Sequence, residues 1–410
     1  MSVLPRPLDL PSFPWDQLTP YRKRAAEHPG GVCDLSIGTP VDPTPALIQE
    51  ALQEHADAPG YPTVIGTPEL RHAILAWGKR RNMVDVGLQG VVPSIGSKEA
   101  VAWLPFLLGV RPGDTVLFPQ ASYPTYDISA RLAGATPLPV DPTDPSSWPD
   151  AQLVWLNSPG NPDGHVLTLD QLRAVVQWAR SHDAVVISDE CYSALAWEEP
   201  FLHEGVPSLL DERVCDGDPR SLIVLYSLSK QSNLAGYRAA LMYGDPELLA
   251  PVIEVRKHSG MMVPAPVQAA MRVALEDTEH VEAQRQVYAR RREILIDAIA
   301  RTGLERDKDS AAGLYLWVRD PQGDLDSWQL VDAFAQRGIV VAPGDFYGEA
   351  GAGFVRVALT ATDERVAEAA SRLIAQPIRA RRLSDLVGVR AFSIPKTDPL
   401  QSHIGHHGAN

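Results

Sequence analysis

The sequence has little cysteine, only three residues in a chain of 410, at positions 33, 191 and 215. Their spacing provides neither a disulfide framework nor the paired ligands of a zinc site. Long apolar runs are absent too, because proline or charge interrupts them, and this argues against a membrane span. Residues 1–20 are rich in proline and contain no apolar core segment, so we expect no signal peptide. The expected location is the reducing cytoplasm.

Positive charge is also scarce. Lysine and arginine total 37 against 51 aspartates and glutamates, which gives a net charge of −14. Because the basic residues are not clustered except near the C-terminus, we expect no nucleic-acid partner. The hydrophobic share of 45% and the charged share of 21% are typical of a soluble globular protein. A chain of this length favours two domains over a single core.

The middle of the chain alternates between apolar and amphipathic segments. Between residues 91 and 245, apolar runs such as 153–156, 184–189 and 221–226 are each followed by a polar turn and then a helical pattern. This alternation predicts a largely parallel sheet with helices on both faces, an α/β fold. In such sheets ligands bind at the carboxyl ends of the strands, which is where the polar turns fall.

The flanking regions differ in texture. Beyond residue 250, a long charged helix over 278–302 precedes strands and helices that predict a smaller α+β domain. The histidines of the C-terminal end have no partner ligands, so we expect no metal site. The expected division is an N-terminal arm with part of the small domain over 1–40, a large domain over 41–255, a small domain over 256–376 and a disordered tail over 377–410.

Lys230 lies just past the apolar run 221–226, in a turn that contains Ser227 and Ser229. Partial burial there disfavours the ammonium form and favours a nucleophilic amine. The two hydroxyls and the fixed charge of Arg238 are groups that bind phosphate. A nucleophilic lysine beside a phosphate cradle suggests a Schiff base with pyridoxal phosphate. From this segment alone, a surface lysine after an ordinary strand is an equally good interpretation.

Other strand ends carry residues that such a cofactor needs. Its ring nitrogen stays protonated beside a carboxylate, and Asp189 ends an apolar strand, where a loop cap is the alternative. Tyr192 and Asn161 offer hydrogen bonds to the phenolate oxygen, although Asn161 also lies in an ordinary turn sequence. Tyr123 offers an aromatic face for stacking, or it is a half-buried loop residue.

The phosphate group and a substrate need further partners. Gly96, Ser97 and Lys98 lie between a strand and a helix, where main-chain amides bind anions, although Gly-Ser before a helix is common. Arg356 lies inside an apolar strand, where an unpaired guanidinium is costly. Either a protein carboxylate or an anionic ligand must therefore meet it, and a substrate carboxylate fits a bidentate arginine.

Taken in order, these motifs resemble the class I aminotransferases of pyridoxal phosphate fold type I, over about residues 34–374. The resemblance implies a large domain with a mostly parallel sheet flanked by helices, and a smaller α+β domain. One departure is Asp163, which stands where the family commonly has threonine. The matching segments are Ile37-Gly-Thr-Pro40, Tyr61, Gly96–Ala100, Tyr123-Pro124, Asn157-x-Pro-x-Asn161-Pro162, Asp189-Glu190-x-Tyr192, Ser227-x-Ser229-Lys230, Arg238 and Arg356.

The resemblance implies a role for each residue. Lys230 would form the Schiff base and later carry a proton, and Asp189 would pair with the ring nitrogen. Tyr192 and Asn161 would bind the phenolate oxygen, and Tyr123 would stack on the ring.

The resemblance also implies how phosphate and substrate are held. A tyrosine matching Tyr61 reaches the phosphate of the neighbouring subunit in this family, which implies an obligate homodimer. The phosphate would be bound by Ser97, Lys98, Ser227, Ser229 and Arg238, and the substrate α-carboxylate by Arg356 with Gly38 and Asn161.

Three segments, 34–43, 256–268 and 341–347, resemble one branch, the actinobacterial succinyldiaminopimelate aminotransferases of lysine and diaminopimelate biosynthesis. This resemblance implies amino transfer between glutamate/2-oxoglutarate and N-succinyl-2-amino-6-oxopimelate. An aminotransferase for aspartate, alanine or aromatic amino acids, and a C–S β-lyase on the same fold, remain alternatives. A pyridoxal-phosphate-sensing regulator is disfavoured, because residues 1–30 are too short and proline-broken for a helix-turn-helix.

Overall fold

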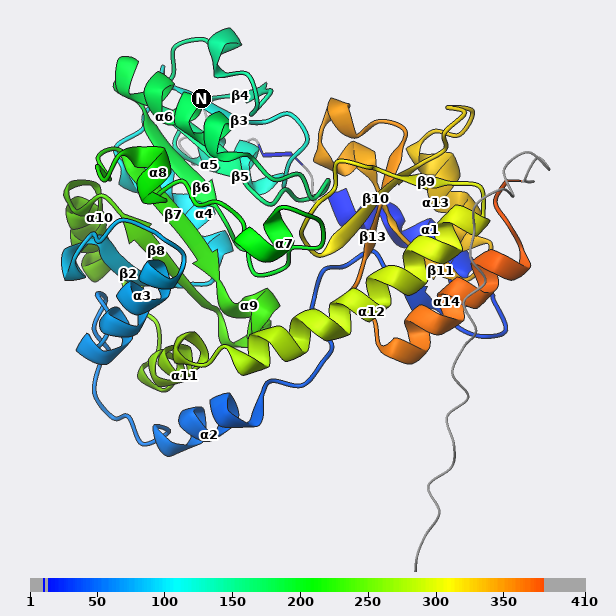
Figure 1. Cartoon of the computed structure of the whole chain (residues 1–410), viewed down its shortest axis with the longest axis horizontal. Coiled ribbons are helices and arrows are strands. Elements are labelled where there is room, and N and C mark those ends of the chain that lie inside the picture. Colours follow the sequence, from blue (N-terminus) through cyan, green and yellow to red (C-terminus); the bar gives the residue numbers. More distant parts are fainter. Residues whose placement is uncertain (1–9, 12–13, 380–410) are drawn as a thin grey trace, which may run out of the picture.

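A computed structural model of the chain describes residues 10–11 and 14–379, which form two domains joined by a long helix and by an extended segment (Figure 1). The larger domain contains a seven-stranded sheet with the order β2-β8-β7-β6-β5-β3-β4. Strand β8 runs antiparallel to β2 and β7, whereas the other neighbours are parallel. This confirms the mostly parallel sheet. Its strands are β2 (Val91–Ile95), β3 (Thr115–Pro119), β4 (Thr136–Val140), β5 (Leu153–Asn157), β6 (Val185–Asp189), β7 (Leu222–Ser227) and β8 (Ala239–Gly244).

Helices cover both faces of this sheet because its central strands are apolar on both sides. In β7, Leu222 and Val224 belong to one core and Ile223 and Leu225 to the other, as a period of two residues requires. The first core is covered by α3 (Pro68–Arg80), α6 (Leu169–Ser181) and α11 (Ala265–Glu276), and the second by α4 (Ser97–Leu107), α5 (Thr125–Leu132) and α10 (Pro246–Ser259).

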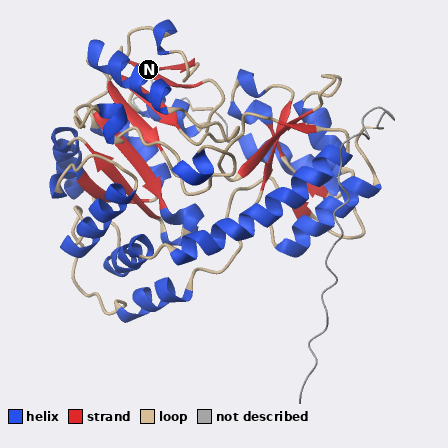
Figure 2. Ribbon diagram, viewed as in Figure 1, coloured by secondary structure: helices blue, strands red, loops and turns tan. Residues whose placement is uncertain are grey.

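The smaller domain lies on the right of Figures 1 and 2 and has its own core. Its four-stranded antiparallel sheet has the order β12-β13-β10-β9, and β1 (Cys33–Asp34) pairs in parallel with β11 (Ile339–Val340). The N-terminal residues from Pro14 therefore pack in this domain. Its other elements are α1 (Thr19–Ala26), β9 (Glu305–Arg306), β10 (Tyr315–Arg319), α13 (Ser327–Ala335), β12 (Ala342–Pro343), β13 (Phe354–Ala358) and α14 (Asp363–Ala375).

Helix α12 (Glu279–Arg301) runs from one domain to the other (Figure 1). Met271 of the preceding α11 is buried in a core of the large domain, whereas Tyr288 and Leu295 of α12 are buried in the core of the small one. We propose on this packing that the chain leaves the large domain within α12, later than the boundary expected after residue 255.

Short helical segments complete the described chain. The α-helical ones are α2 (Ala46–Glu54), α7 (Phe201–Glu204), α8 (Glu212–Cys215) and α9 (Leu228–Gln231). The 3₁₀ segments are Pro14–Leu18, Leu88–Gly90, Pro145–Ser147, Ala235–Tyr237, Gly344–Tyr347 and Glu349–Gly351.

Two segments differ from the sequence expectation. The sequence of residues 31–40 predicts a strand that ends in the turn Gly38-Thr-Pro40, but the strand is limited to Cys33–Asp34, because the rest runs between the domains and bonds single groups rather than a ladder. Strand β4 was not expected, since its sequence Thr-Pro-Leu-Pro-Val contains two prolines. It forms because β4 is the last strand in the sheet order, and an edge strand tolerates missing donors.

The expected tail over 377–410 lies outside the described residues from residue 380 onward. Among the described residues, no helix combines the length and the apolar character needed to cross a bilayer.

Candidate active site

The carboxyl ends of β2, β3, β5, β6 and β7 open into a cavity of about 1450 Å³, to which the small domain contributes β10 and β13. Parallel strands bring these ends to one edge of the sheet, so residues distant in the sequence become neighbours. Every expected site residue except Tyr61 lines the cavity: Gly38, Ser97, Lys98, Tyr123, Asn161, Asp189, Tyr192, Ser227, Ser229, Lys230, Arg238 and Arg356.

Lys230 lies on α9, directly after β7, and its Nζ donates a hydrogen bond to the carbonyl of Gly38. Burial lowers the pKa of the Lys230 amine, and the positive charges of Arg356 and Arg238 act in the same direction. A lowered pKa makes the neutral, nucleophilic amine available at lower pH than for an exposed lysine.

Asp189 ends β6 and is buried. Its Oδ2 accepts a hydrogen bond from the hydroxyl of Tyr126 at 3.0 Å, and its Oδ1 accepts one from the main-chain amide of Cys191 at 3.2 Å. Burial raises the pKa of the Asp189 carboxyl, and in the described part of the chain no cationic side chain forms an ion pair with it. A protonated ring nitrogen would supply the missing positive charge, so this carboxylate fits pyridoxal phosphate.

An anion cradle lies beside this carboxylate. The first amides of α4 have no side-chain cap, and Gly96 precedes them at φ +75°. A Cβ at position 96 would meet the guanidinium of Arg238, and the left-handed φ itself favours glycine there. The hydroxyl of Ser227 donates to that of Ser229 at 2.9 Å. An uncapped helix start, two hydroxyls and an arginine fit a phosphate group.

Arg356 is buried in β13, but no carboxylate pairs with it among residues 10–11 and 14–379. Its Nη1 donates to Oδ1 of Asn161 at 2.8 Å and its Nη2 to the carbonyl of Ser36 at 2.7 Å. The guanidinium carbon lies 3.9 Å from the ring centre of Tyr315, and its Nε has no partner among the described residues. Of the two alternatives left open by the sequence, the anionic ligand is therefore favoured over a protein carboxylate.

Two tyrosines bring the domains together beside Lys230. The hydroxyl of Tyr192, from the large domain, lies 3.3 Å from that of Tyr315 on β10. Burial raises the pKa of Tyr192, whereas for Tyr315 the charges of Arg356 and Lys230 outweigh burial and lower the pKa. Tyr315 is thus a candidate hydrogen-bond donor that sequence reasoning missed.

Tyr126 and Asn157 were missed as supports of Asp189. Tyr126 lies three residues after Tyr123, which was a usable signal. Nδ2 of Asn157 donates to the main-chain oxygen of Asp189 at 2.9 Å. Tyr315 left no such signal, because it reaches the site only through the antiparallel pairing of β10 with β13.

Tyr61 lies apart from the cavity. Its side chain is 99% exposed in the loop between α2 and α3. Within one chain it contacts none of the cavity groups described above.

Asp163 lies in the turn that carries Asn161. His165 connects this turn to the small domain. Nδ1 of His165 lies 3.3 Å from Asp163 and Nε2 lies 3.0 Å from Asp307, which follows β9. Burial lowers the pKa of His165, but the bond to Asp307 and the charges of Asp163 and Asp309 outweigh it and raise the pKa to about 9. The imidazolium therefore ties the Asn161 turn to the small domain.

Comparison with known proteins gives one consistent result. The family model "Aminotransferase class I and II" matches residues 31–373. The 4-dedimethylamino-4-oxo-anhydrotetracycline transaminase OxyQ of Streptomyces rimosus is 52% identical over 366 residues, which cover 89% of this chain and 99% of that protein. The LL-diaminopimelate aminotransferase of Aquifex aeolicus is 34% identical, with 89% and 96% covered.

A solved structure agrees with these relatives. The probable N-succinyldiaminopimelate aminotransferase of Thermus thermophilus superposes with a TM-score of 0.78 at 29% identity, covering 88% of this chain and 99% of that one.

Replacing Lys230 by alanine tests the proposed anchor. Because its amine is the proposed attachment point, Lys230→Ala mixed with pyridoxal phosphate should lack the visible absorption band that covalent attachment to the lysine produces. The control Lys79→Ala, which removes an exposed lysine of α3 that does not line the cavity, should keep the band. A Lys230→Ala protein that retains the band contradicts the assignment.

The His165 bridge predicts a pH-dependent stability. The folded-state pKa lies above the ordinary value of 6.5, so the stabilisation is complete below 6.5 and is lost as the pH rises through about 9. The melting temperature of the wild type should therefore fall more between pH 6.5 and 9.5 than that of His165→Gln. The exposed His72→Gln serves as control and should follow the wild type, and identical slopes in all three proteins would refute the bridge.

Proposed function

We propose, from the premise that this chain belongs to the class I and II aminotransferase family, that it transfers an amino group between glutamate/2-oxoglutarate and N-succinyl-2-amino-6-oxopimelate. Aminotransferase chemistry, pyridoxal phosphate dependence and fold type I are properties of the family to which the chain belongs. The particular substrate is our proposal.

Each part of the reaction has a candidate residue. When bound, pyridoxal phosphate supplies the electron-accepting ring that carries the amino group between the two substrates. Lys230, with its desolvated amine, is proposed to attach the cofactor and then to hold a proton at Nζ. The carboxylate of Asp189 is proposed to keep the ring nitrogen protonated.

The observation that carries the proposal is Arg356. A buried guanidinium held by neutral acceptors keeps its charge available for an anion, and an α-carboxylate is common to amino acids and 2-oxo acids. Asn161 and Gly38 lie beside it in the same cavity. Two similar proteins are named for diaminopimelate or its N-succinyl derivative, which supports that substrate class.

A second candidate substrate is a bulky polycyclic ketone. The relative that is 52% identical is named as a transaminase of 4-dedimethylamino-4-oxo-anhydrotetracycline. The cavity of about 1450 Å³ also exceeds the roughly 300–1,000 Å³ of pockets for drug-sized ligands.

We also propose that the chain acts as a cytoplasmic homodimer in which Tyr61 reaches the phosphate of the other subunit. The support is its nearly complete exposure in a loop of the large domain, since an aromatic side chain of this size is normally covered.

A panel of amino donors tests the substrate. With 2-oxoglutarate as acceptor, N-succinyl-diaminopimelate should give a kcat/KM about 100-fold above alanine, aspartate or phenylalanine, because a site that binds a distal polar group rejects substrates lacking it. Glutamate formation is the measurement. A response no better than that of alanine rejects this substrate. Pyruvate and ammonia released from cystathionine would indicate the lyase instead, and amination of the tetracyclic ketone would favour the second candidate.

Replacing Arg356 by alanine tests the carboxylate site. The loss of two charge-assisted hydrogen bonds of roughly 1.5 kcal/mol each should raise KM about 100-fold for every amino acid and 2-oxo acid. The control Arg319→Ala removes an exposed arginine of the neighbouring strand β10 that pairs with Glu305, and it should leave KM unchanged. An increase in KM restricted to one substrate would show that Arg356 does not bind the shared α-carboxylate.

A further inference from the structure

An extended segment, residues 35–44, crosses between the domains and passes the active site. We call it the crossing segment. Gly38 at its centre is tightly enclosed, because a Cβ there would collide with the hydroxyl of Tyr315. Three consecutive carbonyls of the segment accept side-chain hydrogen bonds: Ser36 from Arg356, Ile37 from Thr360 and Gly38 from Lys230.

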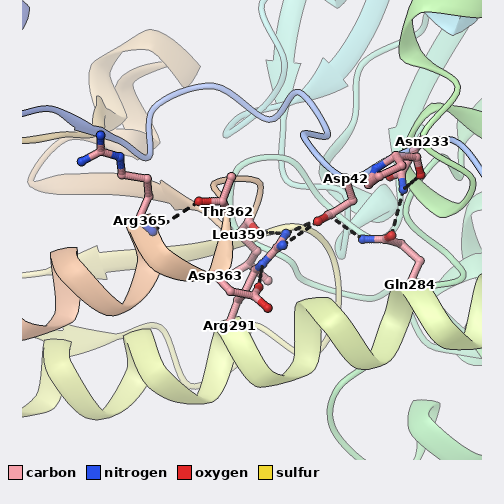
Figure 3. Close-up of polar contacts among 9 residues, drawn as sticks. Asp42, Asn233, Gln284, Arg291, Leu359, Thr362, Asp363 and Arg365 are labelled. Carbon is pink, nitrogen blue, oxygen red and sulfur yellow. Dashed lines mark hydrogen bonds and ion pairs between the residues drawn. The ribbon is translucent and has the colours of Figure 1, made fainter. Parts of the chain in front are cut away.

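The far end of the crossing segment is held by a buried arginine of the interdomain helix. Arg291 of α12 is only 3% exposed, and its Nη1 and Nη2 lie 2.8 and 2.6 Å from the two oxygens of Asp42 (Figure 3). Gln284, two turns earlier on α12, donates its Nε2 to Oδ2 of Asp42 at 2.9 Å. Burial raises the pKa of Asp42, but these bonds outweigh it and lower the pKa, so the carboxylate stays ionised.

The same end is tied to the Lys230 loop. Asn233, three residues after Lys230 and at φ +56°, donates its Nδ2 to Oε1 of Gln284 at 2.8 Å and to the carbonyl of Pro43 at 3.2 Å (Figure 3). The hydroxyl of Thr44 donates back to the carbonyl of Asn233 at 3.2 Å. The ion pair is therefore continuous, through Gln284, with the loop that carries the reactive amine.

Arg291 also contacts the small domain. Its Nε donates to Oδ1 of Asp363, the first residue of α14, at 2.6 Å. The side chain of Asp363 is 59% exposed, whereas that of Asp42 is 18% exposed. One guanidinium thus holds both the crossing segment and the start of a small-domain helix, and the Asp42 pair is the more buried of the two.

We propose that Arg291 and Asp42 are positioning residues, whose ion pair anchors the crossing segment so that its carbonyls and Gly38 stay in register with Arg356 and Lys230. Neither side chain lines the cavity, so both act through the main chain of the segment. Its other restraints are single hydrogen bonds rather than a continuous ladder, so loss of its anchor lets the carboxylate site shift. The inference rests on the proposed aminotransferase function of that site.

The variant Asp42→Asn tests this role, because asparagine keeps the size of the side chain and removes its charge. With glutamate and 2-oxoglutarate, KM for both should rise about tenfold while kcat changes little, because misplacement of binding groups weakens the carboxylate site. Hydrogen exchange should accelerate in residues 36–44 of the holoenzyme. The control Asp363→Asn removes the other carboxylate of the same guanidinium and should leave KM and this exchange unchanged.

Two further variants separate positioning from folding. Arg291→Lys keeps the charge without the bidentate geometry, whereas Arg291→Met removes both. The KM of Arg291→Lys should therefore lie between those of the wild type and Arg291→Met. If Asp42→Asn does not fold, these two Arg291 variants serve as the test in its place. A lower melting temperature with unchanged KM and unchanged exchange in residues 36–44 overturns the proposal. If the wild type transaminates no donor, the proposed function is rejected instead. The comparison of hydrogen exchange in residues 36–44 then still tests whether the ion pair anchors the segment.

Discussion

Two buried charges of opposite sign, each without a counter-ion among the described residues, govern the organisation of the site. Asp189 is surrounded by neutral donors and Arg356 by neutral acceptors and aromatic faces. Uncompensated charge is costly in a low-dielectric interior, so such groups persist where a ligand completes them. A cationic ring nitrogen and an anionic carboxylate are the complementary groups, and the proposed roles give each buried charge its partner.

The two charges belong to different domains, and the arrangement of the domains therefore decides whether they cooperate. Asp189 ends a strand of the large sheet, whereas Arg356 lies in the small one. The crossing segment and α12 pass between them, and the contacts of Arg291 join both to the start of α14 (Figure 3). Arg291, a buried arginine of the interdomain helix, contacts both the crossing segment and the start of a small-domain helix, which is why we assign it to positioning.

Much of the fold was predictable because its signals are local. Apolar runs predicted the central strands, and a local capping signal begins α6, where Thr168 and Gln171 bond reciprocally. Strand β4 escaped because its prolines argue against a strand unless it is known to lie at an edge. The strand predicted before the turn at Gly38 was too long, since local composition does not reveal that a segment passes between two domains.

The sequence by itself determined which chemical groups follow the strands, and in what order. Parallel topology then brings Lys98, Tyr123, Asn161, Asp189 and Lys230 to one edge, because the ends of parallel strands meet there. Only the tertiary structure decided that Arg356 has no carboxylate partner among the described residues, that Tyr315 joins the site, and that Asp42 meets Arg291. These contacts form between segments separated by tens to hundreds of residues, and no local period or composition encodes such pairings.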